Sequence, residues 1–474
     1  MKTLLKSLTN RPAGRLSIGT YFGYGVGQVG GQIMRDTPAL LLPFYMTTML
    51  GMEAALASAV VLIAKTWVFF ADPTVGVISD RSDTRWGRRR PFILAGGLIA
   101  GVSFFFLFYV PDFETQLALF VYMAALYTLM NTGFSSFSVP YLTMASEMSN
   151  DPDERTTIIS FRNVALNVGL LAGGALAPRL IAAGETPRAG YEFMAAVLAA
   201  IIVVSAIWLF LGTARAPRNI ASPATPSLKE QLQIAQRNRP FVVLISANIL
   251  QYLSAGISYT GMLFFLTYYV GVDPFMIFPI VILLMVGVST LFMPLLVWLA
   301  STYGKLKVYV WSLVAFAVST QVYFFAGSDT LWPIWAGALF TGVFNTAFIL
   351  MSLSLLTDTI AFDRIRSGFK REGALSAVYS ATEKISFAMG AVLFGLLLSA
   401  TGFVESSGGK YMEQPASAIA GIMAGFVVIP ALLHLSSLLV LRHYDLPRDK
   451  LVESSAPVGR REGPAFAADA NKGS

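Results

Sequence analysis

The sequence contains no cysteine and only two histidines, His434 and His443. Disulfides and thiolate metal sites are therefore excluded, and two histidines are too few for a histidine-based metal or catalytic centre. Charged residues are also scarce, at 13% of the chain against roughly 25% in a soluble domain. Because 55% of the residues are hydrophobic and the mean hydropathy is +0.63, the composition indicates a membrane protein.

Apolar stretches of about 20 residues or more, each long enough to cross a bilayer as a helix, recur along the chain. This pattern predicts an all-α membrane protein with twelve spans. They are expected at 18–49, 54–79, 91–110, 115–146, 156–182, 190–213, 240–270, 275–300, 308–326, 331–358, 373–401 and 414–441.

Basic residues lie mainly on one side of these stretches. Of the 34 lysines and arginines, 28 belong to the tails and to the loops on the same side, counting Arg162 near the start of the fifth stretch. Arg179, Arg188 and Lys410 lie in the opposite loops. Since basic loops stay in the cytoplasm, both termini are expected there, and the net charge of +7 does not indicate nucleic acid. The basic N-terminus is not expected to be a signal peptide, because no small-residue cleavage site follows a short apolar core.

The longest connection, residues 214–239, divides the stretches into two sets of six. A weak repeat supports this division, because the basic turn at 79–91 has a reduced counterpart at 303–307. Such paired repeats place a substrate site near the middle of the membrane, between the two sets. The expected divisions are a cytoplasmic tail (1–17), a six-helix bundle (18–213), a cytoplasmic linker (214–239), a second six-helix bundle (240–441) and a cytoplasmic tail (442–474).

One acidic and one basic residue share a face of the second stretch. Asp72 follows Lys65 by about two helical turns, and Val68 lies between them. An acid inside a span is costly unless it is solvated, paired or protonated, so it is usually functional. Asp72 is therefore a candidate protonatable group, neutral in one state and charged in another. A static Lys65–Asp72 ion pair is the alternative.

Charged residues also occur in the middle of the eleventh and first stretches. Lys384 follows Glu383, and its depth argues against snorkelling to the membrane surface. Arg35 and Asp36 lie about one helical turn after Gln32. The guanidinium of Arg35 would suit a carboxylate, sulfonate or phosphate group on a substrate. The alternative is an ion pair that braces the first helix against a neighbour.

Aromatic and hydroxyl side chains lie at mid-membrane in the fourth stretch. Phe134, Ser138 and Tyr141 suit stacking and hydrogen bonding with a sugar, although they are equally ordinary packing residues. Arg162 is a further candidate in the fifth stretch. The glycine-rich run at 24–31 follows no expected strand, so close helix packing is favoured over nucleotide binding.

Charged residues follow the second stretch and precede the fifth. They are candidates for stabilising the cytoplasmic end of the molecule in one of its two access states. Pairing to neighbouring loops and helix ends is expected to stabilise the inward-closed arrangement. These residues are Asp80, Arg81, Arg85, Arg88, Arg89, Arg90, Asp153 and Arg155.

Taken together, these motifs resemble the glycoside–pentoside–hexuronide:cation symporters of the major facilitator superfamily. The resemblance covers nearly the whole membrane region, and it implies a major facilitator fold of twelve transmembrane helices in two pseudo-symmetric six-helix bundles. It rests on residues 65–73, 80–91, 139–141, 153–162, 358 and 370–384.

The same resemblance assigns roles to three residues. Asp72 takes the place of a cation-site acid, Lys384 lies close to both the cation and the sugar sites, and Arg162 lies near the sugar pocket. Sodium-using melibiose permeases have a second acid where this chain has Val68, and their two galactoside-binding acids align with Gln32 and Ser138. A proton needs only one titrating acid, so proton coupling is favoured over sodium coupling.

We therefore expect a secondary active transporter that carries a sugar or sugar derivative, acidic ones included, with a cation by alternating access. It would act without a cofactor as a monomer in the cell membrane, the inner membrane if bacterial. A carrier of a lysolipid or other organic anion is the alternative, and a receptor or membrane enzyme is less favoured. The expected cation-coupling residues are Asp72, Lys384 and Lys65, and the expected substrate contacts are Gln32, Arg35, Asp36, Phe134, Ser138, Tyr141, Arg162 and Lys384.

Overall fold

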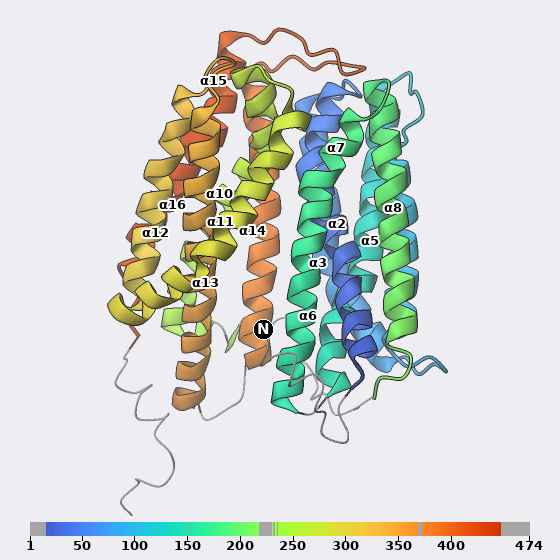
Figure 1. Ribbon diagram of the computed structural model, residues 1–474, viewed down its shortest axis with the longest axis vertical. Helices are drawn as coiled ribbons and strands as arrows, with labels where there is room; N and C mark the ends of the chain where they lie inside the picture. Colours follow the sequence, from blue (N-terminus) through green and yellow to red (C-terminus); the bar gives the residue numbers. More distant parts are fainter. Residues whose placement is uncertain are drawn as a thin grey trace, which may run out of the picture.

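In the computed structural model, residues 16–149, 151–217, 230, 233–234, 236–367 and 372–446 are described. These residues form a nearly all-helical molecule in two bundles, with the N-terminal helices (blue to green) beside the C-terminal helices (yellow to red) (Figure 1). Within this part of the chain, β-structure is limited to two isolated bridges. Residues 1–15 and 447–474 of the expected tails (1–17 and 442–474), and residues 218–229, 231, 232 and 235 of the expected linker, lie outside the described residues.

The N-terminal bundle crosses the membrane six times. Its helices are α2 (Ile18–Thr48), α3 (Ala54–Arg81), α4 (Arg90–Phe108), α5 (Gln116–Met148), a unit of α6 (Pro152–Leu171), the π turn η1 (Ala172–Leu176) and α7 (Ala177–Ala182), and α8 (Pro187–Gly212).

The C-terminal bundle likewise has six crossing units. They are α10 (Arg239–Phe264) with the π turn η2 (Phe265–Val270), α11 (Pro274–Tyr303), α12 (Lys305–Ser319) with the 3-10 turn η3 (Thr320–Phe325), α13 (Trp332–Ser367), α14 (Glu372–Ala400), and a unit of α15 (Ala416–Met423), the π turn η4 (Ala424–Val428) and α16 (Ile429–Leu441).

Local sequence explains where several helices begin. The side chains of Ser17, Thr115, Thr186 and Asn238 cap α2, α5, α8 and α10 by accepting a hydrogen bond from a first-turn backbone N–H. The tenth expected stretch was too short at its C-terminal end. It was expected to end at Asp358, but α13 continues to Ser367, because hydropathy marks the apolar part of a helix and not where the helix ends.

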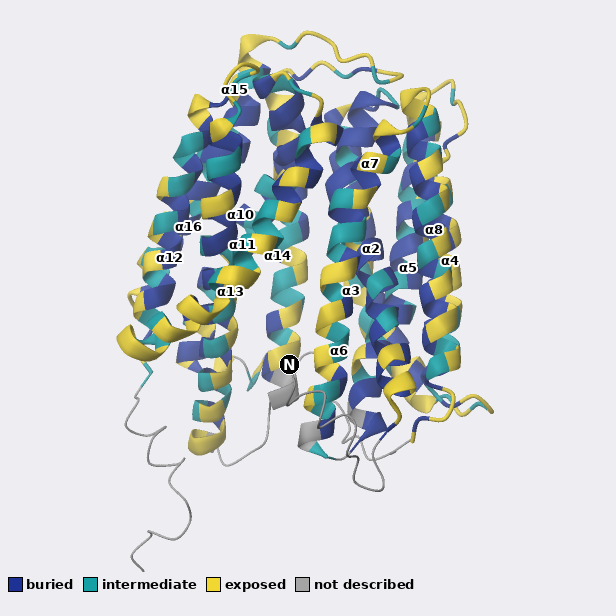
Figure 2. Cartoon of the chain, viewed as in Figure 1, coloured by how far each residue is buried: buried dark blue, intermediate teal, exposed yellow. Residues whose placement is uncertain are grey.

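Eleven helices of the described chain are long and apolar enough to cross a membrane. The first crossing unit, α2, has 31 residues, but glycines and the polar Gln28, Gln32, Arg35 and Asp36 dilute its hydropathy. Many helices carry large apolar residues that are exposed. Figure 2 shows exposed segments along the outer faces of the helices. A lipid environment explains this exposure, because soluble monomers rarely leave such continuous apolar surface open to water.

Glycines allow the helices within a bundle to pack closely. A Cβ added to Gly96 of α4 would lie 2.6 Å from the Gly133 carbonyl oxygen of α5. A Cβ on Gly25, in the glycine-rich run of α2, would lie 3.0 Å from the Phe161 carbonyl oxygen of α6. The prediction that this run favours close helix contact is therefore confirmed.

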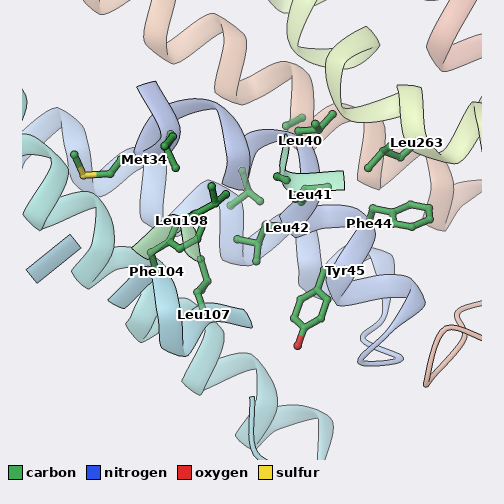
Figure 3. Packing of buried hydrophobic residues seen from close by; sticks show 14 of the residues in the cluster. Met34, Leu40, Leu41, Leu42, Phe44, Tyr45, Phe104, Leu107, Leu198 and Leu263 are labelled. Carbon is green, nitrogen blue, oxygen red and sulfur yellow. The ribbon is translucent and has the colours of Figure 1, made fainter. Parts of the chain in front are cut away.

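The two bundles are joined at the end where the connection from α14 to α15 crosses the molecule, called the closed end below (Figure 1). Leu50 and Ser407 form an antiparallel bridge there, and Ser406 N donates to the Thr47 carbonyl at 3.0 Å. Apolar packing continues below these contacts. Phe44 of α2 stacks edge-on against Phe264 of α10 at 5.1 Å, close to Leu263 (Figure 3).

The opposite end carries the basic turn between α3 and α4 and is called the basic end. Between the bundles, α3 packs against α14 and α2 packs against α10. The charged residues of the candidate site lie on these facing helices.

Candidate functional site

An ion pair links the two bundles near the middle of α3 and α14. Lys384 Nζ of α14 lies 2.9 Å from Asp72 Oδ2 of α3. The other carboxylate oxygen, Asp72 Oδ1, is buried without a hydrogen-bond partner. Among the described residues this oxygen therefore has no partner, and it is available to one.

A second ion pair links the bundles one residue away on the same helix. Glu383 Oε1 of α14 accepts a hydrogen bond from Arg35 Nη2 of α2 at 3.0 Å. Adjacent residues of a helix point about 100° apart, so Glu383 reaches α2 while Lys384 reaches α3. In the first pair α14 contributes the basic residue, and in the second it contributes the acidic one. Together the two pairs link α14 to two helices of the other bundle.

Glu383 is a residue that the sequence analysis left without a role. It was noted only as the neighbour of Lys384. The available signal was its own charge inside an apolar stretch, which carries the same functional implication as that of Asp72. Its partner on α2 could not be identified without the packing of the bundles.

Polar side chains along α2 form a ladder that begins at Arg162 of α6. Arg162 Nε donates to Gln28 Oε1 at 3.0 Å, Gln28 Nε2 to Gln32 Oε1 at 3.2 Å, and Gln32 Nε2 to Asp36 Oδ2 at 2.6 Å. Each step along α2 is four residues, or about one turn, so these side chains share a face. Asp36 also lies 3.6 Å from Arg35 Nε, which joins the ladder to the second ion pair.

Lys65 is held by the fourth span rather than by Asp72. Its Nζ donates to Asn131 Oδ1 at 3.1 Å and lies 5.1 Å from the centre of the Tyr127 ring. The static Lys65–Asp72 pair considered from the sequence is therefore not the arrangement in this conformation, because Lys384 takes that place beside Asp72.

The three candidates on α5 differ in their surroundings. Phe134 is half-buried, and Ser138 Oγ is buried without a hydrogen-bond partner. Tyr141 is fully buried, stacks on Tyr24 at 4.5 Å, and donates to the Tyr24 carbonyl at 3.0 Å, while the Tyr24 hydroxyl donates back to the Tyr141 carbonyl. In this conformation Tyr141 packs α5 against α2, and its hydroxyl is not offered to a ligand.

The basic turn is paired within the N-terminal bundle. Arg89 pairs with Asp80, and Arg88 and Arg89 share Glu147 of α5 at 2.7 and 3.0 Å. Arg90 donates to the Phe210 carbonyl at the end of α8. These contacts hold the basic ends of α3, α4, α5 and α8 together, and Glu147 is a participant that the sequence analysis missed.

The remaining charged candidates at the basic end make local contacts or are not described. Arg85 lies over the neighbouring Trp86 ring at 4.5 Å, and Arg81 is exposed at the end of α3. Arg155 Nε donates to the Ser149 carbonyl at 2.6 Å. The side chain of Asp153 lies outside the described residues.

A buried polar network in the C-terminal bundle was also missed. The Tyr309 hydroxyl of α12 lies 2.6 Å from Gln251 Oε1 and 2.8 Å from Asn248 Oδ1 of α10. Ser352 of α13 joins Asn248 to the Tyr379 hydroxyl of α14. These residues are isolated polar positions in apolar stretches, with no spacing pattern that groups them. Tyr379 is one turn before Glu383, so the network approaches the second ion pair along α14.

The chain is similar to known membrane transporters over most of its length. A family model described as MFS/sugar transport protein matches residues 23–448. The inner membrane symporter YicJ of Escherichia coli (strain K12) is 24% identical over 90% of this chain and 92% of its own. The glucuronide carrier protein homolog of the same strain is also 24% identical, over 94% and 97%.

A solved structure confirms the likeness of the fold. A bacterial homolog of the human lysosomal transporter Spinster, in an inward-facing and unoccupied conformation, superposes with a TM-score of 0.64. It covers 92% of this chain and 97% of its own at 13% identity. At this identity the match concerns the fold alone.

Proposed function

The chain belongs to the family of MFS/sugar transport proteins, and on that premise we propose that it carries a sugar or sugar derivative together with a cation, with the proton favoured over sodium. It is a multi-pass membrane protein with the major facilitator fold, and the family and its relatives are secondary transporters rather than enzymes. The coupling ion and the solute are the parts that we propose.

The observation that carries the proposal is the Lys384–Asp72 ion pair between the bundles. Protonation of Asp72, or binding of another cation beside it, removes the attraction that holds Lys384. A charge left without its partner in this setting is costly, so the positions of α3 and α14 depend on whether Asp72 is neutralised. In this way cation binding is coupled to the movement of one bundle against the other.

The residues around Asp72 favour a proton over a metal cation. A hard cation needs several oxygen ligands, and Val68, one turn before Asp72, supplies none. The neighbouring group is instead the ammonium of Lys384 at 2.9 Å, which would repel a bound sodium ion. One carboxylate oxygen suffices for a proton.

The charges at the site support an acidic solute. The side chain of Arg35 is 50% exposed in the middle of α2, where its ion-pair partners are Glu383 of the other bundle and Asp36 of its own helix. A glucuronide carrier homolog is among the relatives, and a glucuronide carries one carboxylate.

Both termini are proposed to face the cytoplasm. The basic turn from Ser82 to Arg89 lies at the same end of the molecule as the start of α2 and the end of α16. Basic loops remain on the cytoplasmic side, so the basic end is the inner one. We also propose that a single chain is the working unit, because the two bundles that face each other at the charged site belong to one chain.

Uptake into vesicles tests the coupling ion. The purified protein is reconstituted, and accumulation of methyl β-D-glucuronide and methyl β-D-glucoside is measured with a proton gradient or a sodium gradient alone. The proton gradient should drive accumulation, and Asp72→Asn should abolish it while exchange without a gradient survives. Strict sodium dependence without alkalinisation of the external medium would refute proton coupling.

A further inference from the structure

We propose that Glu383 acts as a tethered competitor for Arg35, which an acidic group of the substrate displaces on binding. The inference rests on the proposed transport of an acidic solute and adds a specificity-determining residue to it. In the absence of substrate, Glu383 would neutralise the guanidinium. With an acidic substrate bound, the substrate anion would take its place.

The geometry leaves the guanidinium only partly used. Glu383 makes one hydrogen bond to it, from Arg35 Nη2 at 3.0 Å, and Asp36 lies at 3.6 Å from Nε. A guanidinium has five N–H donors in a planar fork that matches a carboxylate in a two-point contact. A substrate carboxylate can therefore make a better contact than the single hydrogen bond that Glu383 makes.

The pair is also accessible. The side chain of Arg35 is 50% exposed and that of Glu383 is 27% exposed, so the bridge is not sealed by packing. A substrate carboxylate can reach the guanidinium here, and when it takes the place of Glu383 the cation keeps an anionic partner. Exchange of one carboxylate for another at Arg35 therefore requires no unpacking of the core.

Displacement of Glu383 has a consequence that a neutral sugar cannot produce. Glu383 belongs to α14 and Arg35 to α2, so their hydrogen bond is one of the links between the bundles. An acidic substrate that pairs with Arg35 removes this link, whereas a neutral sugar leaves it in place. The neighbouring Lys384–Asp72 pair responds to the cation, so α14 would sense substrate and cation through adjacent residues.

The prediction follows from competition. When a binding site is blocked part of the time, its apparent affinity equals the intrinsic affinity multiplied by the fraction of time that the site is free. Glu383→Gln keeps the shape of the side chain and removes its charge, so the apparent affinity for an acidic probe should rise about fivefold. The affinity for a matched neutral probe should not change.

The experiment uses the purified full-length protein in lipid nanodiscs and two probes that differ at one position. Binding of methyl β-D-glucuronide and methyl β-D-glucoside is measured by calorimetry for the parent and for Glu383→Gln, with Glu383→Ala as a second variant. The matched control is Glu405→Gln, since Glu405 also links the bundles, by accepting from Ala54 N at 2.9 Å at the closed end. Only the Glu383 variants should bind the glucuronide more tightly.

The role of Glu383 and the proposal of an acidic substrate are tested separately by these variants. Weaker or unchanged glucuronide binding in both Glu383 variants, with loss of glucuronide binding in Arg35→Gln, overturns the role of Glu383 and leaves Arg35 as the anion-binding residue. An equal gain in Glu405→Gln also overturns it, because loosening of the bundles would then explain the effect. Binding of the glucoside alone, unaffected by Arg35→Gln, defeats the acidic-substrate proposal as well.

Discussion

Lys384 contacts Asp72 in space and follows Glu383 in the sequence. It pairs with Asp72 across the bundles, and it follows Glu383, which pairs with Arg35. A lysine in the middle of a span is costly to insert, and it is retained here beside a carboxylate that partly offsets that cost. The pairing explains why a charge that hinders insertion is kept.

Removal of Lys384 should separate coupling from folding. In Lys384→Ala, Asp72 loses its cation, so coupled uptake should fall by about tenfold or more, while insertion is unchanged or easier. Uptake in vesicles is compared with the amount of folded protein in the same preparation. A well-inserted variant with normal gradient-driven uptake would show that the lysine is only structural.

Glu147 is the shared acid of the basic turn. Glu147→Gln leaves Arg88 and Arg89 without their common carboxylate, at a position where Glu147 and Arg89 are mostly buried. Hydrogen bonds to charged groups contribute about 2 kcal/mol each, so a clear fall in the melting temperature of the purified protein is expected. Glu53→Gln is the control, since Glu53 is exposed and its side chain does not cap α3. Equal melting temperatures for the two variants would contradict this role.

At the scale of helices, close packing depends on residues without side chains. The α4–α5 contact passes through Gly96, which lies against the backbone of Gly133 and Phe137. Backbone atoms cannot rotate away as a flexible side chain can, so an added methyl group has to move a whole helix. The twelve spans were predicted from hydropathy, but these contact points were not, because a glycine in a span has several other roles.

Gly96→Ala should destabilise the N-terminal bundle. Its new Cβ would lie 2.6 Å from the Gly133 carbonyl oxygen and from Phe137 N, and overpacking of this kind costs about 1–3 kcal/mol. Gly287→Ala in α11 is the matched control, because a Cβ at Gly287 meets no atom within 4 Å. Thermal melting in detergent should separate the two variants, and a Gly96→Ala protein as stable as the control would disprove the packing argument.

At the scale of the whole molecule, the closed end joins the bundles through backbone contacts. The bridge between Leu50 and Ser407 and the hydrogen bond from Gly408 N to the Met49 carbonyl at 2.9 Å have to break for that end to open. Alternating access requires such an opening in a major facilitator. The contacts therefore belong to one state of the cycle.

A disulfide across the closed end should stop transport. Opposite residues of an antiparallel pair have Cα atoms about 5 Å apart, which suits a disulfide, and the chain has no other cysteine to interfere. In a Leu50→Cys/Ser407→Cys variant, oxidation should abolish uptake and a reductant should restore it, with each single cysteine variant as the control. Normal uptake by the fully cross-linked protein would show that this end need not open.

The prediction from sequence succeeded where the signal was local. The hydropathy of each stretch depends on neighbouring residues alone, and it identified the spans of the fold. Asp72, Lys384 and Arg35 stay predicted site residues, which the structure places in ion pairs between the bundles. The prediction was less complete for helix ends, as at Asp358, because hydropathy marks the apolar part of a helix and α13 continues past that part to Ser367.

The sequence by itself therefore determined that this chain is a twelve-span membrane protein with rare charges at its centre. Only the tertiary structure decided which of those charges meet. Asp72 pairs with Lys384, 312 residues away, rather than with Lys65 on its own helix, and Arg35 pairs with Glu383, 348 residues away. The reason is that pairing depends on how each helix is rotated and which bundle it faces, and these are set by the packing of all the helices together.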